Sequence, residues 1–322
     1  MLDSIIAIIE KAEKITILPH IFADGDCLGS SFALAMALKR MGKKVEVYLE
    51  EEIPQMYEFL PGKEISSVYR GERIEPGLAI AIDTGDVERL GSRYGIFKAA
   101  EITVNIDHHS TNTMFGFYNY VDRNSSASAE IIYRMLKMMD TGLDEKIAVL
   151  LYVAIITDTG GFRYSNTTPQ THIIAGDLLN FGINVAEISA KVFDRTSLAK
   201  VRLMGEAIQS LEILENGKIS VITITDEMIS RVQAKEEDCD GLVNLARNIE
   251  GVEAAIMLRH RGKDEIKVNF RSNGNIDVSR IAIMFSGGGH PKAAGCTIRG
   301  DLEKVKEMVL AKIKASLIAN LQ

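Results

Sequence analysis

The sequence predicts an α/β protein in which a parallel sheet with flanking helices is followed by a smaller α/β domain. Short runs of β-branched residues alternate with segments of helical periodicity in the first half of the chain, a pattern typical of a parallel sheet. A second alternation of strand and helix patterns occupies the last third. The length of 322 residues is sufficient for two domains, each with its own core.

The strands of the first domain are predicted from four short apolar runs: ITIL (15–18), KVEVYL (44–49), LAIAID (78–83) and ITVNID (102–107). An amphipathic helix opens the chain, and helix-period segments such as SSFALAMALKRMG separate the strands. This order predicts βαβ units with helices on both faces of the sheet. Further helices are expected over 126–139 and 144–157 and after Thr168, with the first two separated at Asp140-Thr141-Gly142.

The second domain follows a segment whose pattern is helical through IQSLEIL (208–214). Strands are then expected at ISVITIT, EAAIML, EIKVNFRS and AAGCTI, and helices near 240–248, 278–285 and 302–317. The segment between the domains has no low-complexity composition, so a helical connection is expected. We predict a first domain over 1–185, a helical linker over 186–200 and a second domain over 201–322.

Composition excludes several classes of protein. The net charge of −7 argues against a protein that grips long duplexes through an extended basic face. No segment approaches the roughly 20 consecutive apolar residues that a membrane span needs, and the N-terminus does not resemble a signal peptide. Three widely spaced cysteines, Cys27, Cys239 and Cys296, fit a reducing compartment. A cytoplasmic protein without membrane association is therefore expected.

Acidic and histidine residues follow the predicted strands. His20, Asp24 and Asp26 come after the first strand, Asp83 ends the third, and Asp107-His108-His109 ends the fourth. Asp158 ends the apolar run AVLLYVAIITD. Because the carboxyl ends of parallel strands share one edge of a sheet, we expect these residues to converge there.

Converging carboxylates repel one another unless cations neutralise them. Imidazole and carboxylate ligands suit Mn²⁺ or a similar divalent ion, and a bridging aspartate would allow two ions, which points to hydrolysis. Each pattern alone also has a structural explanation: Asp24-Gly25-Asp26 suits a turn and helix N-cap, and a single buried histidine is more often a core residue. The combination at successive strand ends favours the metal site.

These residues resemble the motifs of the DHH phosphoesterase family. His20-Ile-Phe-Ala-Asp24-Gly-Asp26 matches its HxxxDxD motif, Asp107-His108-His109 the triplet that names it, and FRSNGNIDVSRIAIMFSGGGHPKAAG its nucleotide-binding subdomain. The resemblance implies that His20 and Asp24 hold one ion, that Asp26, His108 and Asp158 hold the other, and that Asp83 bridges them. It also implies that Asp107 orients a ligand imidazole and that His109, free of metal, faces the scissile phosphate.

The second domain is expected to bind the nucleotide. Residues 259–299 contain eight Lys or Arg against three acids, although the whole chain is acidic. Gly287-Gly288-Gly289 would let backbone N–H groups approach a phosphate or a base, and His290 could stack or donate a hydrogen bond. Arg271 and Ser272 are candidates for phosphate binding. A glycine triplet without this context is usually only a loop.

The resemblance implies a two-metal phosphodiesterase and phosphatase. The length and layout are similar to those of small bacterial oligoribonucleases of the family, which release 5′-mononucleotides from short RNA and also hydrolyse 3′-phosphoadenosine-5′-phosphate. A homodimer is expected by the same analogy. The alternatives are hydrolysis of linear or cyclic dinucleotides such as pGpG or cyclic di-AMP, a nucleotide-binding regulator without turnover, and a structural subunit of an RNA-processing assembly.

Overall fold

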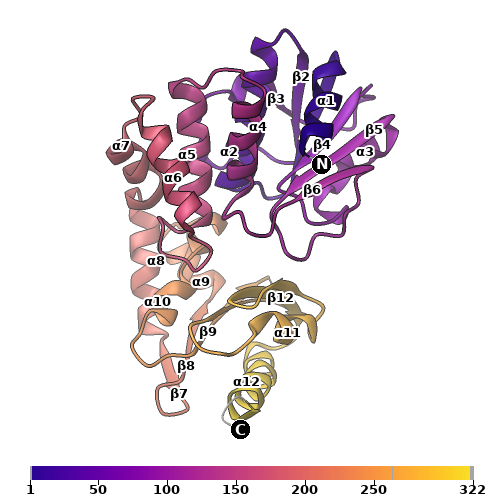
Figure 1. Cartoon of the computed structure of the whole chain (residues 1–322). Helices are drawn as coiled ribbons and strands as arrows, with labels where there is room; N and C mark the ends of the chain where they lie inside the picture. Colours follow the sequence, from indigo (N-terminus) through magenta and orange to yellow (C-terminus); the bar gives the residue numbers. More distant parts are fainter. Residues whose placement is uncertain (1, 263, 320–322) are drawn as a thin grey trace. The chain divides into compact units, whose positions relative to one another are not determined.

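The computed structural model describes residues 2–262 and 264–319 and forms two compact units, Met1–Arg195 and Thr196–Gln322 (Figure 1). The segment between the predicted domains contains helix α7 (Val185–Ser189), a short π-helix (Ala190–Asp194) and the start of helix α8 (Leu198–Gln209). No helix in the described part of the chain combines the length and the apolar character that a membrane span requires.

The first unit contains a six-stranded sheet in which all neighbouring strands are parallel. Its spatial order is β3 (Ser66–Val68), β2 (Lys44–Leu49), β1 (Lys14–Pro19), β4 (Leu78–Ile82), β5 (Ile102–Asp107) and β6 (Tyr118–Val121). The chain runs outward from β1 to β3 and then returns to β4 on the other side of β1. In open α/β sheets, such a reversal forms a crevice at the carboxyl ends of the two strands, here β1 and β4, and ligands bind there.

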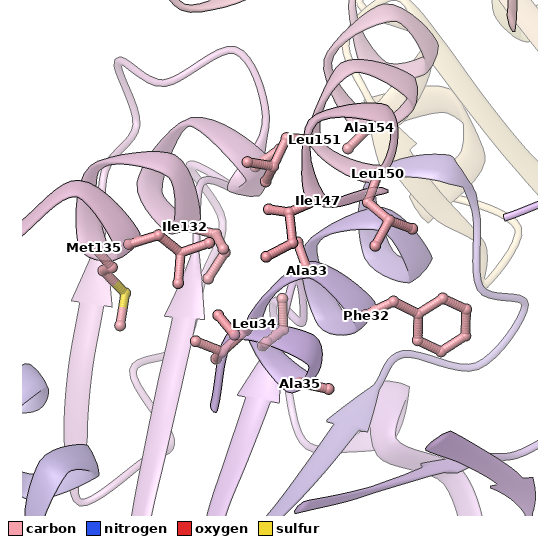
Figure 2. Packing of buried hydrophobic residues seen from close by; sticks show 14 of the residues in the cluster. Phe32, Ala33, Leu34, Ala35, Ile132, Met135, Ile147, Leu150, Leu151 and Ala154 are labelled. Carbon is pink, nitrogen blue, oxygen red and sulfur yellow. The ribbon is translucent and has the colours of Figure 1, made fainter. Parts of the chain in front are cut away.

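Helices cover both faces of this sheet. They are α1 (Leu2–Lys11), α2 (Gly25–Arg40), α3 (Tyr94–Ala99), α4 (Ser128–Met138), α5 (Glu145–Asp158) and α6 (Pro169–Leu179). Apolar side chains of α2, α4 and α5 interdigitate in the larger core, which also includes strand residues such as Ile17 and Ile80 (Figure 2). A smaller core on the opposite face contains Ala79 and Ala81 and residues of α3 such as Phe97.

Two glycines bring α2 close to α5. A Cβ atom at Gly29 would lie 2.4 Å from the carbonyl oxygen of Leu150, and one at Gly25 would lie 2.4 Å from Oγ1 of Thr157. Neither position has room for a side chain. The first turn of α2, which carries Asp26, therefore lies against the last turn of α5, which ends at Asp158.

The second unit has a mixed six-stranded sheet. Its order is β11 (Gly288–His290), β12 (Ala293–Arg299), β10 (Glu265–Ser272), β9 (Ala254–Arg261), β8 (Ile219–Ile224) and β7 (Glu212–Leu214), and only β8 and β9 are parallel. Its further helices are α9 (Asp226–Arg231), α10 (Val243–Arg247), α11 (Val278–Ile283) and α12 (Leu302–Ala319). Two apolar cores stabilise this unit.

The α/β class and the parallel first sheet are as predicted, but three details differ. The helical prediction over 208–214 is wrong beyond Gln209, because residues 212–214 pair with β8. The edge strands β3, β6 and β11 were not expected, since all three are short and at most partly apolar. Asp158 ends a helix, so the argument from strand ends does not apply to it.

Candidate metal centre

The loop after β1 and the residue after β4 place two buried polar side chains together. Nε2 of His20 lies 3.5 Å from Oδ2 of Asp83 and 3.7 Å from Oδ1 of Asp24. Nδ1 of His20 lies 2.6 Å from the carbonyl oxygen of Ile21. A carbonyl oxygen only accepts hydrogen bonds, so Nδ1 carries a hydrogen and Nε2 faces the carboxylates.

Asp83 presents its two carboxylate oxygens to different partners. Oδ1 accepts a 2.9 Å hydrogen bond from Oγ of Ser128 and lies 3.5 Å from Nε2 of His108, whereas Oδ2 faces His20. The backbone φ of Asp83 is +56°, a left-handed conformation that a non-glycine residue rarely adopts and that aims this side chain into the crevice. Asp83 is buried, with 2% of its surface exposed, and its two oxygens face different histidines, so it could contact one cation through each oxygen.

The N-terminus of α4 holds Asp26. The carboxylate accepts hydrogen bonds from the backbone N–H groups of Ser128 (2.6 Å) and Ala129 (3.0 Å) and from Oγ of Ser30 (2.9 Å). N–H groups at the start of a helix have no partner within the helix and carry partial positive charge, so they stabilise a buried carboxylate. Asp26 is thereby fixed in orientation.

His108 contacts Asp158, the last residue of α5. Three carboxylate oxygens surround its Nε2 atom: Oδ2 of Asp158 at 3.4 Å, Oδ1 of Asp83 at 3.5 Å and Oδ2 of Asp26 at 3.8 Å. Nδ1 of His108 lies 3.3 Å from the carbonyl oxygen of Ser125, which leaves Nε2 directed at these acids. The site is thus built from three strand ends and one helix end.

Asp107 contacts the second histidine of the triplet. Its Oδ1 lies 2.7 Å from Nδ1 of His109, and its Oδ2 accepts a 2.5 Å hydrogen bond from Nδ2 of Asn112. The family resemblance implied that Asp107 orients a ligand imidazole; the imidazole that it holds is that of His109. Nδ1 of His109 also lies 3.7 Å from Oδ1 of Asp83.

Crowding of the acids shifts their proton affinities. Burial, followed by the charges on Asp83 and Asp158, raises the pKa of Asp26 well above its usual value. Burial also raises the pKa of Asp158 to about 7, although the charge of His108 opposes this shift. Burial alone would lower the pKa of His109, but its hydrogen bond to Asp107 and the charge on Asp83 raise the pKa to about 9. Asp26 and Asp158 would retain protons unless another cation replaced them.

The donor atoms fit divalent cations. Among the residues that the structure describes, three sets have their ligand atoms within 4.8 Å of one another: Asp26, His108 and Asp158; Asp83, His108 and His109; and His20, Cys27 and Asp83. Imidazole nitrogen and carboxylate oxygen suit ions such as Mn²⁺, and a cation between His20 and Asp83 would replace the proton that their contact otherwise needs. The Cys27 sulfur accepts a hydrogen bond from the backbone N–H of His20 at 3.1 Å.

Sequence reasoning missed Arg89, which lies in a 3₁₀ segment (Glu88–Arg93) shortly after Asp83. Its Nη2 atom is 3.0 Å from Nδ1 of His20. It also missed the amide of Asn112, which holds Asp107, and the hydroxyl of Ser128, which holds Asp83. Their positions near strand ends give only a weak signal, because arginine, asparagine and serine are common in surface loops.

The predicted substrate-binding residues lie in the second unit. Contacts with β12 explain why two of the three residues in the glycine triplet are glycines. A Cβ atom at Gly287 would lie 2.2 Å from the carbonyl oxygen of Gly295, and Gly289 has a φ of +138°. Gly288 has open space around it, and His290 is exposed. The local structure therefore requires glycine at positions 287 and 289 but not at position 288.

The basic residues of the second unit are partly neutralised. Arg259 and Arg261 pair with Glu236, and Arg280 pairs with Asp277. Glu236 lies outside the basic stretch that the sequence singled out, so the local excess of positive charge is smaller than the count suggested. Arg271, near the end of β10, donates a 3.0 Å hydrogen bond to the carbonyl oxygen of Phe270, and the adjacent Ser272 is buried.

Comparisons with known proteins agree with this architecture. Residues 14–155 match the N-terminal domain of the DHH family, and residues 216–317 match the DHHA1 domain. The chain is 33% identical, over 94% of its length and 90% of the relative, to the bifunctional oligoribonuclease and PAP phosphatase NrnA of Thermus thermophilus. It is 30% identical to the protein of that name from Bacillus subtilis, over 92% of this chain and 93% of the relative.

A solved structure is similar over nearly the whole chain. It is that of an exopolyphosphatase-related protein from Bacteroides fragilis, with a TM-score of 0.91 and 28% sequence identity over 98% of this chain and 96% of that chain. Both units of the present fold therefore occur together in a related protein.

Proposed function

Because this chain belongs to the DHH family, we propose that it is a metal-dependent phosphoesterase acting on short nucleotides. Its substrates are short oligoribonucleotides, which it hydrolyses to 5′-mononucleotides, and 3′-phosphoadenosine-5′-phosphate, which it converts to AMP. The names of the relatives from T. thermophilus and B. subtilis support both activities. The observation that carries the proposal is the convergence of aspartates and imidazoles at one crevice, with Asp83 facing histidines through both carboxylate oxygens.

Six residues would hold two divalent ions, with Mn²⁺ as the expected metal: His20, Asp24, Asp26, Asp83, His108 and Asp158. When bound, such ions activate water, polarise the phosphate and neutralise developing charge. Asp83 would be shared between the two positions because its oxygens face opposite groups. The N-terminus of α4 and Ser30 would keep Asp26 in its ligating orientation.

His109 would act on the leaving group. Asp107 holds Nδ1 at 2.7 Å, so the proposal assigns the contact with substrate to Nε2. The raised pKa of His109 keeps the ring protonated at neutral pH. When the phosphorus–oxygen bond breaks, Nε2 would donate its proton to the departing oxygen, and water supplies the oxygen that phosphorus gains.

The second unit would bind the nucleotide. Arg271 and Ser272 would contact a phosphate, while Gly288, with open space around its Cα, would let the backbone approach the ligand. Gly287 would support this loop through its close approach to β12 and Gly289 by pairing with that strand, and the exposed His290 would stack on a base or donate a hydrogen bond to it.

The proposal is tested by a substrate panel with Mn²⁺-loaded protein. The panel contains RNA from two to about twenty nucleotides, 3′-phosphoadenosine-5′-phosphate, pGpG and cyclic di-AMP, compared by kcat/KM. We expect the highest values for the shortest RNAs and turnover of 3′-phosphoadenosine-5′-phosphate. Preference for pGpG or cyclic di-AMP would support the dinucleotide alternative, and absence of hydrolysis would support a binding protein.

A further inference from the structure

We propose that Arg89 is a substrate-binding residue of this site, whose guanidinium donates hydrogen bonds to two non-bridging oxygens of the scissile phosphate. The inference rests on the proposed function, because it assumes that the ligand in the crevice is a phosphoester. It adds a cation from the chain itself to a site that otherwise consists of aspartates and imidazoles.

The backbone holds Arg89 next to the loop that carries His20. The carbonyl oxygen of Arg89 accepts a 2.8 Å hydrogen bond from the N–H of Ile21, and its own N–H donates to Oδ1 of Asp86 at 3.0 Å. The side chain is half-buried, and its Nη2 atom ends 3.0 Å from Nδ1 of His20. Arg89 is thus anchored at both backbone groups, and its guanidinium reaches the edge of the candidate metal centre.

The contact between Arg89 and His20 is not a satisfied hydrogen bond. Nδ1 of His20 already directs its hydrogen at the carbonyl oxygen of Ile21, 2.6 Å away. A nitrogen that carries a hydrogen has no lone pair to offer in the ring plane, and a guanidinium has no acceptor atom. The approach of Arg89 therefore leaves the N–H groups of Nη2 without an acceptor at this imidazole.

Arg89 also lacks an acidic partner within the described residues, although aspartates line the neighbouring crevice. Arg93, four residues later in the same segment, has an acidic partner: Nε pairs with Glu50 at 3.0 Å, and Nη1 donates to the carbonyl oxygens of Pro19 and Tyr48, whereas its buried Nη2 has no hydrogen-bond partner among the described residues. Arg93 is fully buried and serves the fold. Arg89 therefore has N–H groups at the site that can donate hydrogen bonds to a bound ligand.

Phosphate is the ligand whose oxygens best accept hydrogen bonds from these N–H groups. A guanidinium offers N–H donors in a planar fork that fits two oxygens of a phosphate, and partial burial strengthens the interaction by excluding water. Divalent ions in the crevice would neutralise most of the charge of the surrounding aspartates, so a further cation favours an anionic substrate. Charge that develops on the phosphate oxygens during hydrolysis would strengthen the same contact.

The test uses the full chain and two substitutions, Arg89→Gln and Arg89→Lys, with Arg70→Gln as the matched control. Arg70 is exposed, and its guanidinium pairs only with Glu52 among the described acids, so its loss should leave the site unchanged. Three quantities are measured: Mn²⁺ content after loading, the affinity for inorganic phosphate by calorimetry, and kcat/KM for 3′-phosphoadenosine-5′-phosphate.

We expect Arg89→Gln to bind inorganic phosphate about tenfold more weakly and to lower kcat/KM about a hundredfold, with unchanged Mn²⁺ content. Arg89→Lys should lie between Arg89→Gln and the wild type because it keeps the charge but loses the fork. The control should match the wild type in all three measurements.

Two results would overturn the inference. Phosphate affinity and kcat/KM equal to those of the wild type in Arg89→Gln would show that Arg89 does not contact the ligand. Loss of Mn²⁺ from both Arg89 variants would show that Arg89 instead supports His20 as a ligand. If the wild type hydrolyses no substrate, the proposed function fails, and the phosphate titration still decides whether Arg89 binds the anion.

Discussion

The metal centre in the first unit and the glycine-rich loop in the second unit differ in one respect: whether the fold would need their residues even without a ligand. Asp26, Asp83 and His108 come from three separate segments and are buried or half-buried with donor atoms close together. In the loop, by contrast, Gly287 is needed for its close packing against β12, and Gly289 pairs with β12 at a positive φ, whether or not a ligand binds. The convergence of polar groups that are unfavourable to bury is therefore stronger evidence for function than a motif whose residues are also needed for contacts with β12.

Replacing Asp83 by Asn would test the metal centre with the largest expected effect. The substitution removes the charge that faces histidines on both sides, so we expect kcat to fall by about a thousandfold or more and Mn²⁺ content to fall with it. Phosphate release and elemental analysis measure the two effects. Near-normal turnover with full metal content would show that Asp83 is not the shared ligand.

His109→Ala should separate proton transfer from metal binding. We expect kcat to fall about a hundredfold, because general acid catalysis is lost, while Mn²⁺ content stays at the level of the wild type. Steady-state kinetics on 3′-phosphoadenosine-5′-phosphate and elemental analysis give both values. Loss of an ion in this variant would instead make His109 a ligand, which its position near Asp83 and His108 also allows.

Gly29→Ala should show that close packing of α2 on α5 supports the metal centre. The added methyl group would meet the carbonyl oxygen of Leu150, so we expect the free energy of unfolding to drop by about 1–3 kcal/mol. Gly176→Ala in α6 is the matched control, since that position has open space and alanine should stabilise the helix by about 0.5–1 kcal/mol. Equal stability of the two variants in denaturant unfolding would refute the packing argument.

The second unit is tested by Gly288→Ala and Arg271→Gln. We expect each substitution to raise KM for short RNA by about tenfold with little change in kcat or stability, because the residues would bind the substrate away from the bond that breaks. Gly287→Ala is the contrasting variant and should lower stability, since its methyl group would meet Gly295. An unchanged KM in both Gly288→Ala and Arg271→Gln would show that these residues do not bind the substrate.

Asp107→Asn should give the smallest effect, a change in pH dependence. The hydrogen bond that His109 donates to Asp107 raises the pKa of His109, so the protonated ring persists at low pH and is lost as the pH rises through that pKa. Removing the carboxylate charge lowers the pKa, and the alkaline decline of kcat should move to lower pH. A pH profile of kcat that matches the wild type would contradict the proposed role of His109.

The sequence was sufficient to predict the central strands and the acids that follow them. β1, β2, β4 and β5 are apolar and β-branched, and the parallel order then brings His20, Asp83 and Asp107 to one edge. The place of Asp158 beside this edge depends on glycines that let α5 approach α2, which is a property of tertiary packing. The pairing of Asp107 with His109 and the approach of Arg89 to His20 likewise depend on loop conformations that periodicity does not encode.

Titration of metal-free protein with Mn²⁺, followed by phosphate release from 3′-phosphoadenosine-5′-phosphate, tests the central claim most directly. If the aspartates and imidazoles around Asp83 form a two-metal hydrolytic site, activity should be absent without metal and should rise until two ions are bound per chain. Full activity in the presence of a chelator, or no activity at saturating Mn²⁺ with any member of the substrate panel, would contradict it.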